Sequence, residues 1–180
     1  MQRMPLVEPP PDVTRWLAQA GGETINLYRA LANAPDMLRA YLKMAWGLRL
    51  DARTPRALRE LLILRGAQVA GSEYEQGHHL RMAREAGVPE TQIAALSRWR
   101  EASVFTAPER AVLALAEELA DGSLTDETAA DLASHFDEAA RVELILTGGF
   151  YVMLARVIDA LGVPLEPELA APGPGDGARP

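Results

Sequence analysis

Residues 58–83 read LRELLILRGAQVAGSEYEQGHHLRMA, and this stretch decides the fold. Its apolar residues recur at spacings of three and four, which is the period of an α-helix. Gly71 is typical of a helix end, and Ser72 directly after it is typical of the cap of a new helix. The stretch therefore predicts two successive helices joined by a tight turn.

The same period continues over the rest of the chain, whereas alternation over more than four residues is almost absent. Proline in a first turn and glycine after a last turn mark most of the helix ends. The predicted helices cover 11–20, 35–50, 54–71, 72–87, 88–99, 108–120, 125–135 and 137–161, with a further short turn at Asn26. We predict an all-α protein without strands.

The length of 180 residues fits one ordinary domain with a real core. We assign residues 1–170 to a single all-helical domain. Residues 171–180 are rich in glycine and proline and hold no apolar anchor, so we expect a disordered tail there.

Two segments of the chain resemble each other at a distance of 83 positions. Glu60-Leu61 with Gly66 recurs as Glu143-Leu144 with Gly149 in similar apolar surroundings. The repeat indicates a diverged internal duplication, and chance similarity between two amphipathic helices is an alternative of equal weight.

Charge and cysteine content exclude several function classes. Eighteen basic and twenty-five acidic side chains give a net charge of −7, which repels nucleic acid and anionic lipid. We therefore expect neither a nucleic-acid nor a membrane partner. The chain has no cysteine, which excludes disulfides, thiolate metal sites and thiol nucleophiles.

The beginning of the chain contains prolines where a signal peptide needs an unbroken apolar stretch, and no later apolar run approaches 18 residues. From this we expect a cytoplasmic protein.

Glu75 and His79 form a candidate proton-transfer pair. At a spacing of four they lie on one helix face together with small and apolar residues, so partial burial raises the pKa of the carboxyl group. The alternative is an ordinary glutamate–histidine pair on a solvated surface.

Glu60 is the third candidate, because the apolar residues around it indicate burial on more than one side. A buried carboxylate needs a partner, and Glu60 can meet His79 if it points between the two helices. The alternative is a surface charge paired with Arg56 or a neighbour such as Arg59.

The sequence resembles the carboxymuconolactone decarboxylase and alkylhydroperoxidase D-like family over most of its length. The resemblance rests on residues 26–32, Arg59-Glu60-Leu61, Glu73-Tyr74-Glu75, His79, Ala86-Gly87, 148–151 and 161–163. It implies an alkylhydroperoxidase D-like helical bundle that forms a homo-oligomer, a trimer or hexamer with a dimer also open, and a polar pocket at or near a subunit interface.

In the peroxidase branch of that family, a glutamate is followed after twelve positions by a cysteine, after three more by a second cysteine, and after four more by a histidine. Glu60, Ser72, Glu75 and His79 stand at these positions here. Both thiols are therefore replaced while both proton-handling groups remain. Peroxidase chemistry is excluded, because serine and glutamate cannot form the disulfide that the reduction cycle requires.

The resemblance thus implies the cysteine-free branch, whose decarboxylase members act on a small carboxylated lactone without a metal or an organic cofactor. Many relatives have tryptophan and asparagine where this chain has Gln76 and Val152. A different small substrate is therefore as plausible as the lactone.

Four further residues are candidates for substrate binding. Tyr151 can donate a hydrogen bond to a substrate oxygen, and Arg156 can hold a carboxylate, although helix packing and an interhelix ion pair are the alternatives. Tyr74 and Ser72 border the same face of their helix. Four methionines are interpreted as filler of the core or the pocket: Met37, Met44, Met82 and Met153.

Three functional classes follow from the sequence. The first is a cofactor-independent acid–base enzyme, such as a decarboxylase, isomerase or lactone hydrolase, in which His79 moves the proton, Glu75 shares its charge and Glu60 orients it. The second is a non-catalytic binding or assembly protein that retains the family pocket. The third is a metal site made of Glu60, Glu75 and His79.

Overall fold

The computed structural model describes residues 2–169, which are helical with no strand among them. The prediction of an all-α fold is confirmed. The predicted tail at 171–180 lies outside the described residues, and the single domain over 1–170 stays a prediction. The helices are α1 (Pro11–Gln19), α2 (Asn26–Leu31), α3 (Pro35–Leu50), α4 (Arg56–Ala70), α5 (Glu73–Glu85), α6 (Glu90–Ala95), a 3₁₀ turn (Leu96–Arg98), α7 (Ala107–Asp121), α8 (Asp126–His135) and α9 (Glu138–Leu161).

The turn between α4 and α5 forms as its sequence predicts. Gly71 ends α4 with a positive φ of 67°, a conformation that glycine adopts without a steric cost. The hydroxyl of Ser72 then accepts a hydrogen bond from the backbone N–H of Glu75 at 3.4 Å. This tight turn brings α5 back along α4, so that residues of the two helices face each other.

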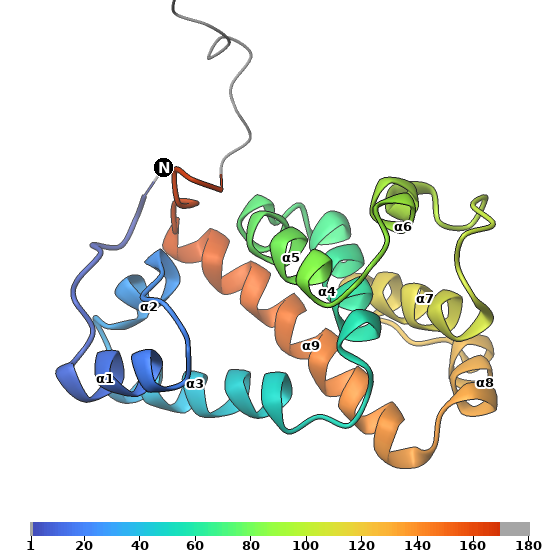
Figure 1. Cartoon of the computed structure of the whole chain (residues 1–180), viewed down its shortest axis with the longest axis horizontal. Helices are drawn as coiled ribbons and strands as arrows, with labels where there is room; N and C mark the ends of the chain where they lie inside the picture. Colours follow the sequence, from blue (N-terminus) through green and yellow to red (C-terminus); the bar gives the residue numbers. More distant parts are fainter. Residues whose placement is uncertain (1, 170–180) are drawn as a thin grey trace, which may run out of the picture.

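Helix α4 is the central element of the molecule. It packs against α5, α7 and α9 (Figure 1), and Leu61, Leu62, Ile63 and Leu64 are all buried. Four consecutive buried residues require neighbours on every side of the helix. Because a single chain covers all of them, these residues do not support the prediction of a homo-oligomer.

Helix α9 runs diagonally across the molecule and joins its two halves (Figure 1). By length and composition it could cross a membrane, contrary to the expectation that no apolar run approaches this size; 39% of its most apolar window is buried in the protein. One such helix is weak evidence for a membrane span, since the core helix of a soluble bundle passes the same test. Here α9 packs against both α4 and α7.

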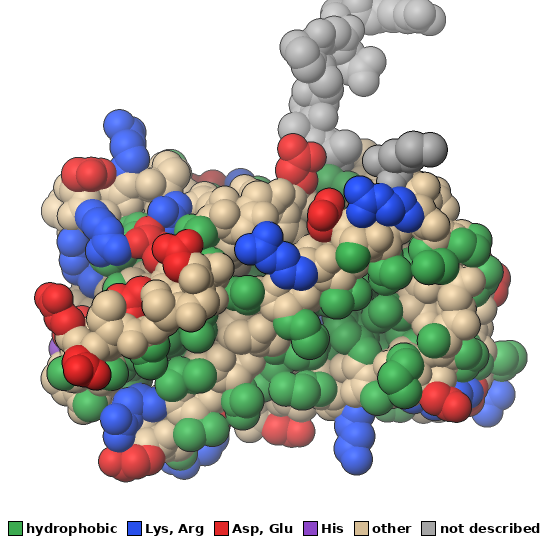
Figure 2. Space-filling view, turned by 180° about the vertical axis from the view of Figure 1, so that it is seen from behind, with side chains coloured by type: hydrophobic (Ala, Val, Ile, Leu, Met, Phe, Trp, Pro, Cys, Tyr) green, Lys and Arg blue, Asp and Glu red, His purple; other side chains and the backbone are tan. Residues whose placement is uncertain are grey.

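Three of the four methionines are not filler. Met37, Met44 and Met153 are 62%, 44% and 50% exposed, whereas Met82 lines a pocket. Figure 2 shows that hydrophobic side chains reach the surface over a broad area of the face seen from behind. Helical periodicity alone does not tell which side of a helix its neighbours cover.

Candidate active site

Glu60 and His79 form the centre of the candidate site. Glu60 on α4 is fully buried, and its Oε2 lies 2.7 Å from Nδ1 of His79 on α5. The helix turn at Gly71 makes this contact possible by folding α5 onto α4. The structure therefore brings these two predicted residues into direct contact.

Arg56 completes an ion-paired network around Glu60. It lies one helical turn before Glu60, and its Nε donates to Glu60 Oε1 at 2.5 Å. Burial by itself would raise the pKa of the Glu60 carboxyl group, but His79 and Arg56 outweigh this effect and hold the pKa below its usual value. Glu60 is thus an anion that takes part in both contacts considered from the sequence, although buried rather than on the surface.

The anionic Glu60 fixes the orientation of the histidine. Since a carboxylate only accepts hydrogen bonds, Nδ1 of His79 carries the proton in this contact. The other ring nitrogen, Nε2, is then left to exchange protons. Tyr151 on α9 packs edge-on against the imidazole with ring centroids 4.7 Å apart, which further restrains the ring.

Glu75 behaves in the opposite way to Glu60. It is 2% exposed, and its Oε1 has no hydrogen-bond partner among the described residues. Burial raises the pKa of Glu75 to about 8, so the side chain is a neutral acid at pH 7. No hydrogen bond joins Glu75 to His79 within residues 2–169, so the contact that their spacing allows is not made.

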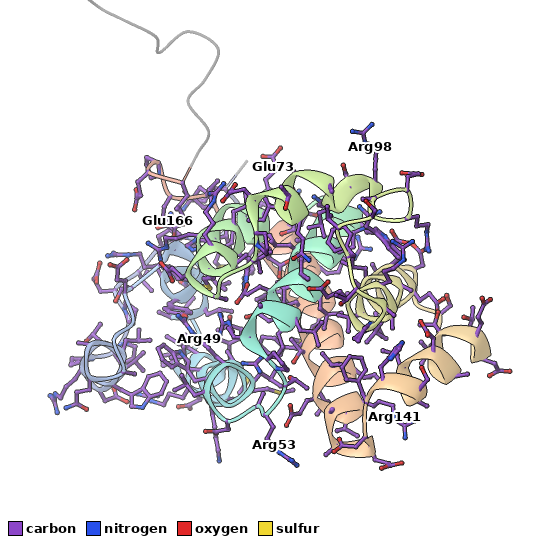
Figure 3. All side chains as sticks on the ribbon, turned by 45° about the vertical axis from the view of Figure 1, so that its right-hand side comes forward. Arg49, Arg53, Glu73, Arg98, Arg141 and Glu166 are labelled. Carbon is purple, nitrogen blue, oxygen red and sulfur yellow. The ribbon has the colours of Figure 1, made fainter. Side chains whose placement is uncertain are left out.

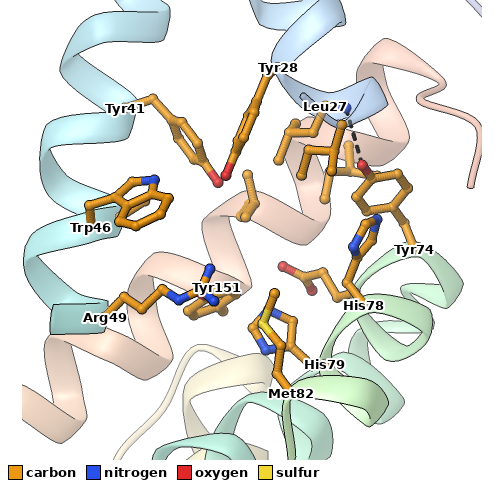
Figure 4. Close-up of a pocket in the computed structure, with 15 residues that line it drawn as sticks. Leu27, Tyr28, Tyr41, Trp46, Arg49, Tyr74, His78, His79, Met82 and Tyr151 are labelled. Carbon is orange, nitrogen blue, oxygen red and sulfur yellow. Dashed lines mark hydrogen bonds between the residues drawn. The ribbon is translucent and has the colours of Figure 1, made fainter. Parts of the chain in front are cut away.

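A pocket of about 60 Å³ lies between the two halves of the molecule (Figure 4). It has room for about four water molecules. Both Glu75 and His79 line it, together with Tyr151, and it is closed on the opposite side by residues of α2 and α3. Most of these lining side chains are aromatic or aliphatic: Ile25, Leu27, Tyr28, Tyr41, Ala45, Trp46, Tyr74, Met82, Leu154 and Ile158.

The wall formed by α3 was missed in the sequence. Tyr41, Trp46 and Arg49 all face the pocket, and Nε1 of Trp46 is a buried donor without a partner among the described residues. Tyr41, Ala45 and Arg49 recur at a spacing of four on one helix face. That periodicity was the available signal, but only the fold shows that this face meets α5.

Ser72 and Arg156 do not reach this pocket. Both line a separate surface hollow of about 450 Å³ near the end of α9, and Arg156 is exposed. Tyr74 borders both cavities, but its hydroxyl group donates to Glu166 at 3.0 Å and accepts from the backbone N–H of Leu27 at 3.1 Å. Ser72 therefore serves as a helix cap and Tyr74 as a structural link.

His78, next to the candidate histidine, belongs to that structural link. Its Nε2 lies 2.7 Å from Glu166 Oε2, and Glu166 Oε1 also accepts from the backbone N–H of Asn26 at 2.6 Å. Burial by itself would raise the pKa of Glu166, but His78 and the backbone donors lower it below its usual value. Glu166 thus ties the segment after α9 to both α2 and α5.

The proposed metal site does not match this geometry. Within residues 2–169, no three histidine, aspartate or glutamate side chains are placed to hold a metal ion. Glu60 already has both oxygens occupied by Arg56 and His79. The three residues therefore do not converge on one point.

A comparison with protein families gives the family directly. Residues 35–118 match the model of the carboxymuconolactone decarboxylase family. This match confirms the resemblance to the family over that region. The matched region contains Glu60, Glu75 and His79, and the absence of cysteine is consistent with the cysteine-free branch.

Solved structures of low sequence identity share the fold. The debrominase Bmp8 in complex with 2,3,4-tribromopyrrole is 21% identical, with 94% of this chain and 96% of that chain covered and a TM-score of 0.80. An uncharacterized peroxidase-related protein from Ralstonia eutropha JMP134, described as an alkylhydroperoxidase AhpD core, is 20% identical, with 93% of each chain covered and a TM-score of 0.79. An uncharacterized peroxidase-related protein from Silicibacter sp. TM1040 is 20% identical, covering 92% and 91% of the two chains, with a TM-score of 0.78. No curated protein matches the sequence.

Proposed function

We propose that this protein is a cofactor-independent acid–base enzyme acting on a small metabolite. The observation that carries the proposal is the opposite protonation of two buried glutamates beside one histidine. Glu60 is held as an anion by His79 and Arg56, whereas Glu75 is held as a neutral acid in the pocket. Pairs of titratable groups whose surroundings separate their pKa values are typical of acid–base sites.

The two groups that face the pocket have complementary roles. Glu75 is the general acid, because at pH 7 it carries a proton and its Oε1 has no hydrogen-bond partner among residues 2–169. His79 is the general base through Nε2, and Glu60 positions it and stabilises the imidazolium that forms. Proton removal by His79 and proton delivery by Glu75 together accomplish an isomerisation with no net change in protons.

Decarboxylation and lactone hydrolysis use the same groups. In a decarboxylation, the bond to the carboxylate breaks, carbon dioxide leaves, and the electron pair stays on carbon, where it takes the proton of Glu75. Glu75 then regains its proton from water. In a lactone hydrolysis, His79 activates a water molecule and Glu75 protonates the leaving oxygen.

The comparisons support a small cyclic substrate without naming it. The family is defined by a decarboxylase, and a structure of the same fold holds the single-ring molecule 2,3,4-tribromopyrrole. The pocket of about 60 Å³ favours a compact ligand over a long chain, and even a single ring enters it only when lining side chains shift.

A second candidate is a small-molecule-binding or assembly protein without turnover. It is favoured by the small volume of the pocket, which leaves little room for a substrate in this conformation. Gln76 and Val152, which differ from many relatives, point the same way.

We further propose that the protein works in the cytoplasm as a homo-oligomer, a trimer or hexamer as the family resemblance implies or a dimer, without nucleic-acid or membrane partners. Light scattering tests the homo-oligomer, because a stable monomer contradicts it.

The test of the enzyme uses carboxylated five-membered lactones in D₂O, followed by proton NMR. Deuterium incorporation and loss of carbon dioxide report proton transfer even where turnover is slow. We expect the variants Glu75→Gln and His79→Ala to lose at least about a hundredfold in rate, since general acid–base groups contribute on that scale. Arg156→Gln is the control and keeps the wild-type rate.

Two outcomes contradict the enzyme. If the wild-type protein binds these lactones but returns them unchanged and without deuterium, the protein is a binding protein. If turnover is present and survives both substitutions, the acid and base lie elsewhere.

A further inference from the structure

Arg49 is the charged group of the pocket that the proton-transfer machinery does not use. It lies in the last turn of α3, and its guanidinium stands 5.1 Å from the ring centroid of Trp46. In Figure 4 the guanidinium points toward Tyr151, whereas Figure 3 shows that Arg53 and Arg98 project outward from the molecule. The side chain therefore presents its charge to the cavity.

The charge of Arg49 is not neutralised by the protein. No carboxylate among residues 2–169 lies within 4.0 Å of it, whereas Arg56 is paired with Glu60 and Arg65 with Glu117. The Glu60–Arg56 pair cancels, and Glu75 is neutral at pH 7. The pocket is thus locally positive in a chain whose net charge is −7.

The position of Arg49 is held from behind. Arg59, which is 4% exposed, donates from Nη2 to the backbone carbonyl of Arg49 at 3.2 Å and from Nη1 to the carbonyl of Thr54. The guanidinium lies over the ring of Trp46, which attracts it as a cation. A planar fork of donors held in this way suits a carboxylate or enolate, which accepts two parallel hydrogen bonds.

The walls next to Arg49 suit a flat ring. Tyr41 and Tyr28 lie with ring centroids 6.2 Å apart, and Tyr151 closes the side next to His79. The buried Nε1 of Trp46 is an unused donor that also belongs to this wall. A ligand oxygen that accepts from it removes the cost of leaving this N–H unpaired.

From these observations we propose that the pocket binds a small planar organic anion, with its carboxylate or enolate on Arg49 and its unsaturated ring between the aromatic side chains. The proposal rests on the proposed function in one respect only, because it places the ring atoms next to Glu75 and His79. A single ring exceeds the present volume of about 60 Å³, so Met82, whose side chain is long and flexible, shifts as it enters.

The assignment replaces Arg156 as the residue that holds a substrate carboxylate. Arg156 is exposed and lines the other hollow, which neither Glu75 nor His79 lines. The two arginines therefore form a matched pair for an experiment: one faces the pocket, and the other lies on the surface.

The test measures binding of 2-furoate, a planar carboxylate, and of 2-furamide, its neutral analogue of the same shape. Isothermal titration is done at pH 6.5 and constant ionic strength on the wild-type protein and on Arg49→Gln and Arg156→Gln. We expect the wild-type protein to bind 2-furoate at least about tenfold more tightly than 2-furamide, which a charge-assisted pair is able to provide. Arg49→Gln loses this preference, and Arg156→Gln keeps it.

Each other outcome overturns the proposal. Equal binding of the two ligands, or no binding of either, shows that the pocket does not select an anion. A preference that survives Arg49→Gln but is lost in Arg156→Gln moves the anion to the surface hollow. Circular dichroism and thermal melting establish that both variants are folded.

Because 2-furoate need not react, this result is independent of turnover. An anion preference without any proton transfer leaves the binding inference intact and removes the enzyme. Proton transfer that requires Glu75 but not Arg49 supports the enzyme and removes the binding inference.

Discussion

Glu60 and Glu75 are the same amino acid on two adjacent helices, both buried, yet their surroundings give them opposite charges. Glu60 has two cationic or donating neighbours, whereas Glu75 has an oxygen with none among the described residues. The cost of burying a charge without a partner is what keeps the proton on Glu75. The difference lies in the neighbours: Arg56 on the same helix and His79 on α5 for Glu60, and none for Oε1 of Glu75 among the described residues.

Glu75 makes stability depend on pH in a defined window. Its pKa is about 8 in the folded protein against 4.5 as its ordinary value. Between these values the folded state holds a proton that the unfolded state has lost, so stability is full below pH 4.5 and falls as pH rises toward 8. We expect the free energy of unfolding to fall by about 4 kcal/mol across this window.

Urea unfolding at pH 5, 6, 7 and 8 measures this dependence. Glu75→Gln keeps the shape of the side chain and has no proton to lose, so its curve is flatter than that of the wild-type protein over the same range. Other titrating groups contribute equally to both proteins. Parallel curves contradict a neutral Glu75.

For Glu60 we expect that removing the charge destabilises the protein, because Glu60 is a buried anion with two partners. Glu60→Gln leaves the partly buried Arg56 without its carboxylate and removes the anion that His79 contacts, and we expect a loss of about 3 kcal/mol in unfolding free energy. Glu143→Gln is the matched control, because Glu143 corresponds to Glu60 in the repeat at a distance of 83 positions. Glu143 accepts from the backbone N–H groups of Arg53 and Thr54, and its amide replacement still accepts one bond, with a loss of about 1 kcal/mol. Equal losses contradict the difference between the two positions.

The residue scale is also where sequence reasoning reached its limit. The apolar run around Glu60 was enough to indicate burial, and the tight turn at Gly71 was enough to place His79 beside it. Arg49 was missed, since its partner surface comes from helices distant in sequence. Arg156 was favoured only because it shares α9 with Tyr151, and its exposure depends on which side of α9 packs inward.

At the scale of a single helix, α9 contains two adjacent glycines with different surroundings. A Cβ added at Gly148 would lie 2.5 Å from Leu119 of α7, whereas one added at Gly149 meets nothing within 4 Å. We expect Gly148→Ala to lower the free energy of unfolding by about 2 kcal/mol through overpacking. Gly149→Ala raises it by about 0.5 kcal/mol through better helix propensity.

Thermal melts of the two single variants measure this difference. Each serves as the control for the other, since both have the same substitution in the same helix. Two shifts of the same sign contradict the packing of α9 on α7.

Helix ends were predictable because their signals are local. Pro35 in the first turn of α3 and Gly71 after α4 define their ends within a residue or two of the structure. Which face of a helix is covered depends on contacts across the molecule, so Met37 and Met153 were wrongly interpreted as filler.

At the scale of the whole molecule, Glu166 joins segments from the two ends of the described chain. Glu166→Ala leaves His78, Tyr74 and the N–H of Asn26 without their acceptor, and we expect a loss of about 3 kcal/mol. Hydrogen exchange adds a local readout: the amide of Asn26 exchanges faster. Glu168→Ala, at an exposed neighbouring position, changes stability by less than about 0.5 kcal/mol. Unchanged exchange at Asn26 contradicts the link.

The pocket is lined by residues from helices far apart in the sequence, and this has a consequence for fragments of the protein. The region that identifies the family ends at 118, but Tyr151, Leu154 and Ile158 of α9 and Tyr28 of α2 complete the cavity. A polypeptide trimmed to 35–118 would contain the acid, the base and the guanidinium, yet lack the surfaces that exclude water from them. Glu75 would then ionise like any solvated carboxyl group, and chemistry that depends on its retained proton would vanish even though each reactive side chain was still there.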